Sequence, residues 1–358
     1  MSLDILKNNR GIAILVSIMV TAILVATSLE LNRRVRSAVL TTAAIRDRLT
    51  LSHMASSGIH VAMAMLIKDK KETTIDSLQE IWADPEKINQ MLAEIPFEDG
   101  KLNLTVSDEL GKIQVNALVQ FPGGHDFSEP QMNLWDRFFR LPAVIDESFE
   151  NTIDPTEVIN SAKDWLDSGD DDAITGLSGA ESDYYENLDP PYSCRNGPFT
   201  HLNEFGLIKG ITPQVMAEIE NKSGISRYLS IHGATRVGTS SVTYKGKINL
   251  NTAAIPVIAA LLPPGNESLA EAIADYRTET SDSKYIHDLS SPTWYKSVPG
   301  CSHIVIDPDL LTTSSEVFKI ESAAMWRGMQ VSAKVIVQRE RTEETGKWTC
   351  KVLRWKIE

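Results

Sequence analysis

The segment "KNNRGIAILVSIMVTAILVATSLELNRR", residues 7–34, decides the fold of this 358-residue chain. Residues 12–29 form an eighteen-residue run without a charged side chain, which is close to the minimum that spans the hydrocarbon core of a bilayer. The run is longer than the apolar region of a typical signal peptide, and no convincing small-x-small cleavage site follows it before Glu30. We therefore expect an anchor that is retained. Its orientation stays open, because Lys7 and Arg10 precede the run while Arg33 and Arg34 follow it.

Helix-forming residues continue beyond the apolar run. Residues 31–57 contain neither glycine nor proline, and Gly58 is followed by "IHVAMAMLIKD". One helix is therefore expected over residues 12–70, with residues 12–31 in the membrane and a length of roughly 85 Å. A helix that lies half in lipid and half on a domain resembles the spine of a type IV pilin. The short leader 1–11 fits a pilin, with cleavage between Gly11 and Ile12, and an ordinary signal anchor is the alternative.

Period-two patterns on both sides of a long central region predict strands. Leu102, Leu104 and Val106 alternate with polar residues, and "DELGK" supplies a turn into a second strand with Ile113 and Val115. The segments 316–326, 329–340 and 348–358 predict three more strands, separated by short polar turns. The expected fold class is α+β, with a pilin-like α/β domain of antiparallel sheet built from residues 71–120 and 305–358.

Residues 121–304 have a different composition, in which helical segments are joined by loops rich in proline, glycine and aspartate. This pattern predicts a large, mostly helical domain inserted into the pilin-like domain. Part of it, "KINLNTAAIPVIAALLPPGNESLAEAIADYRTE" (247–279), resembles helix-hairpin-helix DNA-binding modules. Its hairpin carries two acids instead of basic residues, and the whole chain has a net charge of -13. Nucleic-acid binding is therefore the least favoured function.

Catalytic and soft-metal motifs find little support. The seven histidines form no HExxH spacing, and "GLSGA" (176–180) lacks the final glycine and the preceding strand of a nucleophile elbow. Because no nucleophile and base converge, we expect no enzyme activity. Cys194, Cys301 and Cys350 form no CxxC pair, and their spacing leaves open which two would bridge in an oxidising compartment.

The stretch "DWLDSGDDDAITGLSGAESDYYENLD" (164–189) holds nine acids and no basic residue. Two carboxylates 4 Å apart repel by about 4 kcal/mol at an effective dielectric constant near 20, so a cation or solvent must separate them. Calcium, a hard cation with six to eight oxygen ligands, suits such a loop. The spacing is not that of an EF-hand, because the glycine position falls on Asp172 and the bidentate position on Ser178. A solvated acidic loop is the alternative.

Several motifs together resemble one family. In chain order they are "RGIAILVSIM", "SSGIHVAMAMLIKD", "DSLQEIWADP", "DELGKIQVNAL", "DWLD" with "GAESDYYENLDPPY", "NGPFTHLNEFGLIKGIT" and "KINLNTA". Each motif alone is weak, but seven in the same order resemble the protein K family of type II secretion systems, the large minor pseudopilins.

The resemblance implies an inner-membrane protein whose bulk is periplasmic, cleaved and N-methylated at Ile12 by the prepilin peptidase. It also implies a structural Ca²⁺ site in the insert. Carried over by position, the candidate ligands are Asp167, Asp170, Asp171, Glu181, Asp183 and Asn196. Gly169 stands where the family has an acid, which leaves open which of residues 170–172 binds the ion.

The implied partners are the minor pseudopilins I and J, other pseudopilins and the inner-membrane assembly platform. The family forms the tip of a periplasmic pseudopilus, primes its assembly and supports export of folded proteins across the outer membrane. Contacts with I and J are expected along the apolar helix, where Ala13, Ser17 and Ala22 allow close approach, as does Ala26. Val16 stands where ordinary pilins carry a glutamate, which suits a tip subunit. The main rival is a signal-anchored periplasmic calcium-binding scaffold or adhesin.

Overall fold

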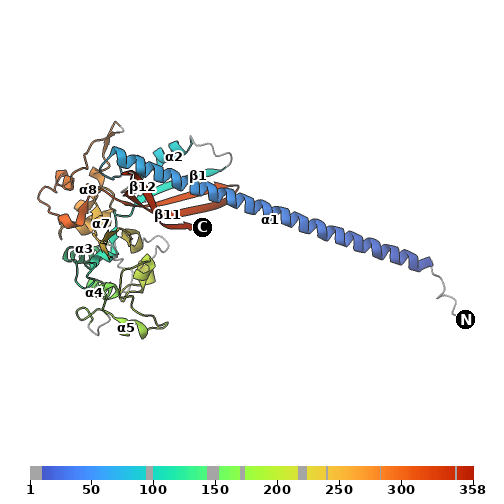
Figure 1. The fold of residues 1–358 in the computed structure, drawn as a ribbon, viewed down its shortest axis with the longest axis horizontal. Helices are drawn as coiled ribbons and strands as arrows, with labels where there is room; N and C mark the ends of the chain where they lie inside the picture. Colours follow the sequence, from blue (N-terminus) through green and yellow to red (C-terminus); the bar gives the residue numbers. More distant parts are fainter. Residues whose placement is uncertain are drawn as a thin grey trace.

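A computed structural model describes residues 10–93, 100–142, 153–169, 174–216, 224–238, 241–282, 284–342 and 345–358. Its first element is α1, Arg10–Glu72, a single helix of 63 residues that projects from the rest of the molecule as a stalk (Figure 1). At 1.5 Å per residue the helix is about 95 Å long. The expected long N-terminal helix is confirmed. Among the described residues, the part of the chain over 11–72 is the one helix long and apolar enough to cross a membrane.

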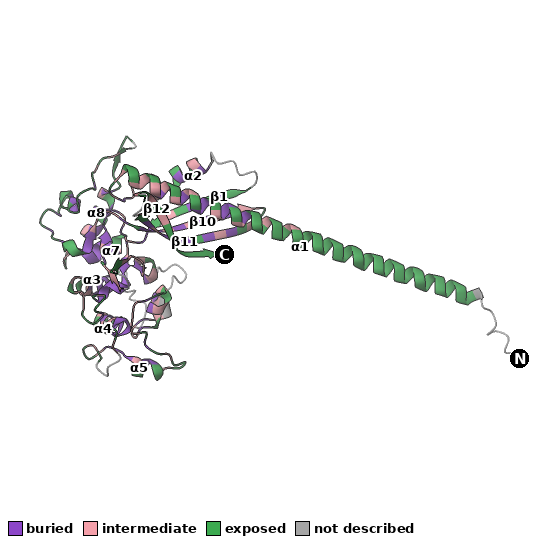
Figure 2. Ribbon diagram, viewed as in Figure 1, coloured by how far each residue is buried: buried purple, intermediate pink, exposed green. Residues whose placement is uncertain are grey.

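The two ends of α1 have different surroundings. Its side chains are almost all exposed up to residue 50, and from Leu51 onward one face is buried (Figure 2). Leu51, Ala55, Ile59 and Leu66 recur every three to seven residues, so they form one stripe along the helix. Gly58 lies in this stripe, where a Cβ atom would meet Ser322 Oγ at 2.3 Å. The glycine therefore lets the helix approach the sheet closely.

The stripe packs on a four-stranded antiparallel sheet in the order β1-β10-β11-β12. The strands are β1 Lys101–Asp108, β10 Val317–Trp326, β11 Met329–Arg341 and β12 Trp348–Ile357. Val331, Ala333, Val335 and Val337 alternate along β11 and are buried against α1, as their spacing predicted. The α+β fold class is confirmed.

The predicted second strand is confirmed at Ile113, whereas Val115 lies in the 3-10 turn that follows it. β2, Ile113–Gln114, does not form a hairpin with β1 but pairs in parallel with β3, Leu229–Ser230. The neighbour of β1 is β10, more than 200 residues later, with Lys101 opposite Met325. Since a period-two pattern records which side of a strand is buried and not which strand lies beside it, the sequence could not distinguish the two pairings.

The insert has its own hydrophobic core, which runs from Ile113 to Leu311 and is separate from the core between α1 and the sheet. The sequence had placed this insert at residues 121–304. Its helices are α3 Glu129–Phe139, α4 Pro155–Leu166, α5 Ser182–Glu186, α6 Pro213–Met216, α7 Ile255–Leu261 and α8 Leu269–Tyr276. The pilin-like part contains the short helix α2, Pro85–Ala93. The cysteines at 194, 301 and 350 are free thiols.

Short elements complete the described chain. The 3-10 turns are η2 Ile81–Ala83, η3 Val115–Leu118, η4 Leu202–Leu207, η5 Ile225–Tyr228, η6 Trp294–Ser297 and η7 Pro308–Leu310. The short strands are β4 Ala234–Val237, β5 Ser241–Tyr244, β6 Ile248–Asn249, β7 Thr280–Ser281, β8 Lys284–Tyr285 and β9 Leu311–Thr312.

The insert is tied to the pilin-like part by a buried polar residue. Asn249 Nδ2 donates to the carbonyl of Asp76 at 2.9 Å, to Asp108 Oδ2 at 2.9 Å and to Ser315 Oγ at 3.0 Å. These acceptors lie after α1, at the end of β1 and before β10. Because a buried amide is costly unless its hydrogen bonds are made, this contact favours one arrangement of the three segments.

Candidate calcium site and a second acidic cluster

The last turn of α4 places two acids on one face. Asp154 caps the start of the helix by accepting from Thr156 N at 2.9 Å, and Asp167 is the C-cap residue. Asp164 lies three residues before Asp167, so the two side chains share a face of the helix. Asp164 is 0% exposed and Asp167 is 8% exposed, so neither carboxyl is an ordinary solvated surface acid.

Asp164 also holds the loop that follows. Its carboxylate accepts hydrogen bonds from Thr175 N at 3.0 Å and from Ala180 N at 2.8 Å. At Gly179 a Cβ atom would lie 2.1 Å from Asp164 Oδ2, so the loop can wrap the carboxylate only with glycine there. The segment "GLSGA" (176–180) therefore wraps around the buried carboxylate of Asp164. Ser178 Oγ accepts from Asn160 Nδ2 at 3.1 Å, in contact with an amide and not with a general base.

The wrap brings Glu181 to the same place. One carboxylate oxygen from each of Asp164, Asp167 and Glu181 lies within 4.8 Å of the others. Lys163 Nζ lies 3.2 Å from Asp167 Oδ2 and donates to Thr175 Oγ1 at 3.0 Å. Burial raises the pKa of the Asp164 carboxyl. Within the described residues, three buried carboxyls thus gather beside the Lys163 ammonium group.

Asn196 supplies a further oxygen next to this group. The Gly197 amide donates to the Trp165 carbonyl at 3.2 Å, and Cys194 Sγ lies 3.6 Å from the Asp164 carbonyl, so this segment passes along the end of α4. Asn196 Oδ1 is buried and accepts no hydrogen bond from the described part of the chain. Asn196 also adopts φ 52°, a left-handed conformation that asparagine tolerates. A buried amide oxygen without a donor is available to a cation.

The six ligands expected from the resemblance have different outcomes. Asp167 and Glu181 are brought together, and Asn196 lies on the segment beside them. Asp183 is exposed on α5 and is outside the group that the described residues form. Asp170 and Asp171 lie outside the described residues. Asp164 was missed as a ligand, although its i, i+3 spacing from Asp167 was a usable signal.

Carboxylate and amide oxygens are the donors that Ca²⁺ prefers, and this donor set contains no sulfur or imidazole ligand that would favour a transition metal. The residues present therefore fit calcium. Asp164, Asp167, Glu181 and Asn196 are called the candidate calcium site below. A calcium ion bound by these oxygens would offset the negative charge of the carboxylates. It would also link the end of α4 to the loops before and after α5.

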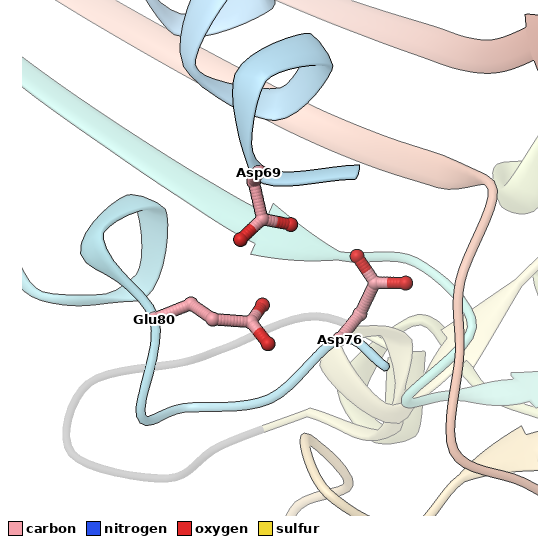
Figure 3. A group of neighbouring side chains, drawn as sticks. All are labelled: Asp69, Asp76 and Glu80. Atoms are coloured by element: carbon pink, nitrogen blue, oxygen red, sulfur yellow. The ribbon is translucent and has the colours of Figure 1, made fainter. Parts of the chain in front are cut away.

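A second acidic cluster, which the sequence did not reveal, lies where α1 ends. Asp69, Asp76 and Glu80 point their carboxylates toward one another, with one oxygen of each within 4.8 Å of the others (Figure 3). The buried guanidinium of Arg339, on β11, contacts this second acidic cluster. Its Nη1 donates to the Leu66 carbonyl at 3.0 Å and lies 3.4 Å from Asp69 Oδ2, and its Nη2 donates to Asp76 Oδ1.

Other groups complete this second cluster. The Ser315 amide donates to Asp76 Oδ2 at 2.8 Å, and Trp82 Nε1 donates to Glu80 Oε2 at 2.7 Å. Burial raises the pKa of Asp69 to about 6 and that of Glu80 to about 8. The cluster thus has internal partners for its acids, which is the arrangement of a structural junction.

The segment that resembles a helix-hairpin-helix module has its hairpin between α7 and α8. The Gly265 amide donates to Glu267 Oε1 at 2.9 Å. A carboxylate of the same chain therefore occupies the donor that a DNA phosphate needs in such modules.

The fold and this site define a class: a long apolar helix packed on an antiparallel sheet, with an inserted helical domain that carries an oxygen-rich site, is a pilin-like architecture. Residues 111–221 match the family model described as "Type II secretion system (T2SS), protein K". This match covers the candidate calcium site.

Comparison with known proteins agrees. The chain is 25% identical over 302 residues to type II secretion system protein K of Pseudomonas aeruginosa, covering 80% of each chain. It is 23% identical over 216 residues to the protein of the same name from Aeromonas hydrophila, covering 60% of this chain and 62% of the relative. The crystal structure of the GspK-GspI-GspJ complex from enterotoxigenic Escherichia coli contains a chain with the same fold. The TM-score is 0.60 at 14% identity, over 88% of this chain and 99% of that one. The resemblance to type II secretion system protein K is confirmed.

Proposed function

We propose that this protein is a minor pseudopilin of a type II secretion system that assembles with the minor pseudopilins I and J at the pseudopilus tip. The observation that carries the proposal is the match to protein K, both in sequence and in the fold of the chain from the GspK-GspI-GspJ complex. The role is structural. The protein primes pseudopilus assembly and supports export of folded proteins across the outer membrane.

The exposed part of α1 supports an assembly role. Ile12, Leu15, Met19 and Leu24 are each more than half exposed, so this part of the helix carries apolar surface that no described segment of the chain covers (Figure 2). Such a surface is stable only in lipid or against other apolar helices. The proposal gives it both: residues 12–31 lie in the inner membrane before assembly and against other pseudopilins afterwards, and the bulk is periplasmic.

Processing at the start of α1 is part of the proposal. Gly11 and Ile12 lie in the first turn of the helix and are exposed, and a Cβ atom at Gly11 would meet nothing within 4 Å. A prepilin peptidase cleaves between them and methylates the new amino group of Ile12. The inner-membrane assembly platform then extracts the mature helix.

The mature N-terminus tests this function against its rival. Protein extracted from membranes is digested, and its N-terminal peptide is sequenced by mass spectrometry. An N-methylated Ile12 is expected. An intact Met1, or cleavage beyond the apolar run, would instead favour the signal-anchored periplasmic scaffold or adhesin. Co-purification with tagged I and J, lost when residues 10–31 are replaced by an unrelated anchor, tests the assembly step.

Calcium has a structural role in the proposal. The ion lies among the three buried carboxylates and Asn196 Oδ1, where it offsets the repulsion of the acids and orders the loops around α4. A ligand present at 100 times its dissociation constant stabilises the folded state by about 2.7 kcal/mol. Addition of chelator to the purified protein is therefore expected to lower its melting temperature.

Variants of the candidate calcium site test this role. Asp167→Ala removes one ligand and is expected to reduce the response of the melting temperature to chelator. The matched control is Asp183→Ala, whose carboxylate is exposed and lies outside the site. Equal melting temperatures of the wild type in calcium and in chelator would contradict the proposal.

A further inference from the structure

A basic cleft lies on the face of the sheet away from α1. It has a volume of about 440 Å³ and lies between this face and the η4, η5 and β3 segments of the insert. Six cationic and two acidic side chains line it, in a chain whose net charge is -13. The cations are Lys112, Arg227, Lys319, Lys334, Arg354 and Lys356. Positive charge has thus been gathered at one place on an acidic protein.

The register of the sheet explains this gathering. Ile336 of β11 lies opposite Lys319 of β10 and Arg354 of β12, so these three side chains form one row across the sheet. In the next row Lys334 lies opposite Glu321 of β10 on one side and Lys356 of β12 on the other. Neighbouring residues of the same strands point to the other face, toward α1. Four cations from three strands therefore project into the cleft side by side.

The acids near the cleft leave part of this charge uncompensated. Glu358 Oε2 lies 3.2 Å from Lys334 Nζ and Glu358 also contacts Lys356, so one carboxylate serves two ammonium groups. Glu109 is buried against Lys112, and Lys319 Nζ lies 2.9 Å from Glu321 Oε1. Across the ranges that the structure describes, Arg354 has no ion-pair partner. Burial lowers the pKa of His232, so the imidazole at the wall of the cleft is neutral at pH 7.

The cleft opens along a strand with a free edge. β12 pairs with β11 on one side, and the part of the chain that the structure describes places no strand on its other side. The two faces of β12 differ. Arg354 and Lys356 face the cleft, whereas Trp355 faces α1, with its ring centroid 6.2 Å from that of His60. Val352 and Ile357, 41% and 46% exposed, lie on the same face as Trp355.

We propose that β12 and the basic cleft bind an extended acidic peptide segment of a partner protein, in which acidic and apolar residues alternate. The segment adds to the free edge of β12 as a fifth strand. Its acidic side chains enter the cleft beside Arg354 and Lys356, and its apolar side chains cover Val352, Trp355 and Ile357. Main-chain hydrogen bonds to an edge strand give affinity, and the alternation of side chains gives specificity.

Two other polyanions fit the geometry less well. A lipid surface would have to reach a cleft that lies beyond Leu51, about 30 Å along α1 from residue 31 at 1.5 Å per residue. A nucleic acid has a uniform backbone charge that the overall charge of -13 repels, and it offers no strand to pair with β12. The occupant with both a strand backbone and alternating acids is a peptide.

The test uses the full chain in detergent micelles and a fluorescein-labelled octapeptide in which valine and glutamate alternate. Fluorescence anisotropy measures its binding. Three control peptides are used. The first has the same composition with valine and glutamate grouped in two blocks, the second has lysine in place of glutamate, and the third is N-methylated at alternate amides. The alternating peptide is expected to bind at least tenfold more tightly than each control, and salt should weaken its binding.

Charge-reversal variants locate the site. Arg354→Glu combined with Lys356→Glu is expected to weaken binding at least tenfold. The matched control combines Lys284→Glu with Lys296→Glu, which reverses two exposed charges on the insert and should change binding less than twofold. All four side chains are exposed, and equal melting temperatures of the two double variants would show that both are folded.

Several outcomes would overturn the proposal. Equal binding of the N-methylated peptide would exclude strand addition, and equal binding of the block peptide would exclude the alternation. Tighter binding of an oligonucleotide or of phosphatidylserine vesicles would exclude a peptide as the preferred occupant. Failure of the alternating peptide to bind would refute the proposal. The lysines would then serve to protect an edge strand from self-association.

Discussion

Arg339→Met should be among the most damaging single substitutions in the pilin-like domain. The Arg339 side chain is 0% exposed, and its guanidinium donates to two backbone carbonyls and to the carboxylates of Asp69 and Asp76. It also lies 4.9 Å from the centroid of the Phe318 ring. Methionine fills a similar volume but supplies neither charge nor donors. Asp76, which is 0% exposed, would then keep only the Lys70 ammonium group, 3.5 Å from its Oδ2, as a cationic partner.

The magnitude follows from the loss of the buried pair between Arg339 and Asp76. Removal of one partner of a buried ion pair destabilises a protein by about 3 to 5 kcal/mol. At about 2 to 4 °C per kcal/mol for a domain of 150 to 250 residues, the melting temperature should fall by about 10 °C. The assay is thermal unfolding of the full chain in detergent, followed by circular dichroism at pH 8 and pH 5. The loss should be smaller at pH 5, because burial raises the pKa of Asp69 to about 6 and a protonated Asp69 no longer needs the cation.

Two controls separate this explanation from a general packing defect. Arg140→Met breaks the exposed pair with Asp136 and should leave the melting temperature unchanged, since surface ion pairs contribute little. Addition of Asp76→Asn to Arg339→Met should restore part of the loss, because the second change removes the buried charge. An Arg339→Met loss that is no larger than that of Arg140→Met, or that is the same at both pH values, would refute the reasoning.

Three further predictions concern the second acidic cluster, α1 and the candidate calcium site. Burial raises the pKa of Glu80 from 4.5 to about 8, so its contribution to stability is fully present below about pH 4.5 and is lost as the pH rises toward 8. Glu80→Gln should therefore flatten the fall in unfolding free energy over this window in denaturant titrations, and an unchanged slope would count against the shift. Gly58→Ala places a Cβ atom 2.3 Å from Ser322 Oγ and should lower the free energy of unfolding by about 1 to 3 kcal/mol, whereas Ser57→Ala on the exposed side should not. A Gly58→Ala protein as stable as the wild type would show that the helix can shift without cost. Gly179→Ala should push the loop away from Asp164 and abolish the effect of chelator on the melting temperature, and a full response in this variant would mean that the wrap is not needed for the ion.

Much of the candidate calcium site could be predicted from the sequence, and its missing parts have clear causes. Asp167 and Glu181 are fourteen residues apart, yet both were named from the resemblance, and the structure brings them together. The i, i+3 spacing places Asp164 beside Asp167, but only the wrap at Gly179 shows that the Asp164 carboxylate is buried next to Glu181. Asp183 was carried over by position from the resemblance, and its side chain is exposed on α5.

Local patterns by themselves determined α1, the three C-terminal strands and the α+β class. An uncharged run without glycine or proline leaves the backbone of α1 no better hydrogen-bond partners than its own, and alternation along β10 and β11 requires one buried face. These are properties of consecutive residues, so one sequence is enough to reveal them.

Only the tertiary structure decided which distant segments meet. The pairing of β1 with β10, the position of Arg339 against Asp76 more than 260 residues away, and the basic cleft all depend on how the chain folds back on itself. Hydrophobic patterns specify which face of an element is buried, but many partners satisfy the same face. The choice among them comes from buried polar groups such as Asn249 and Arg339, whose hydrogen bonds to distant segments are made in this arrangement and are lost in the others.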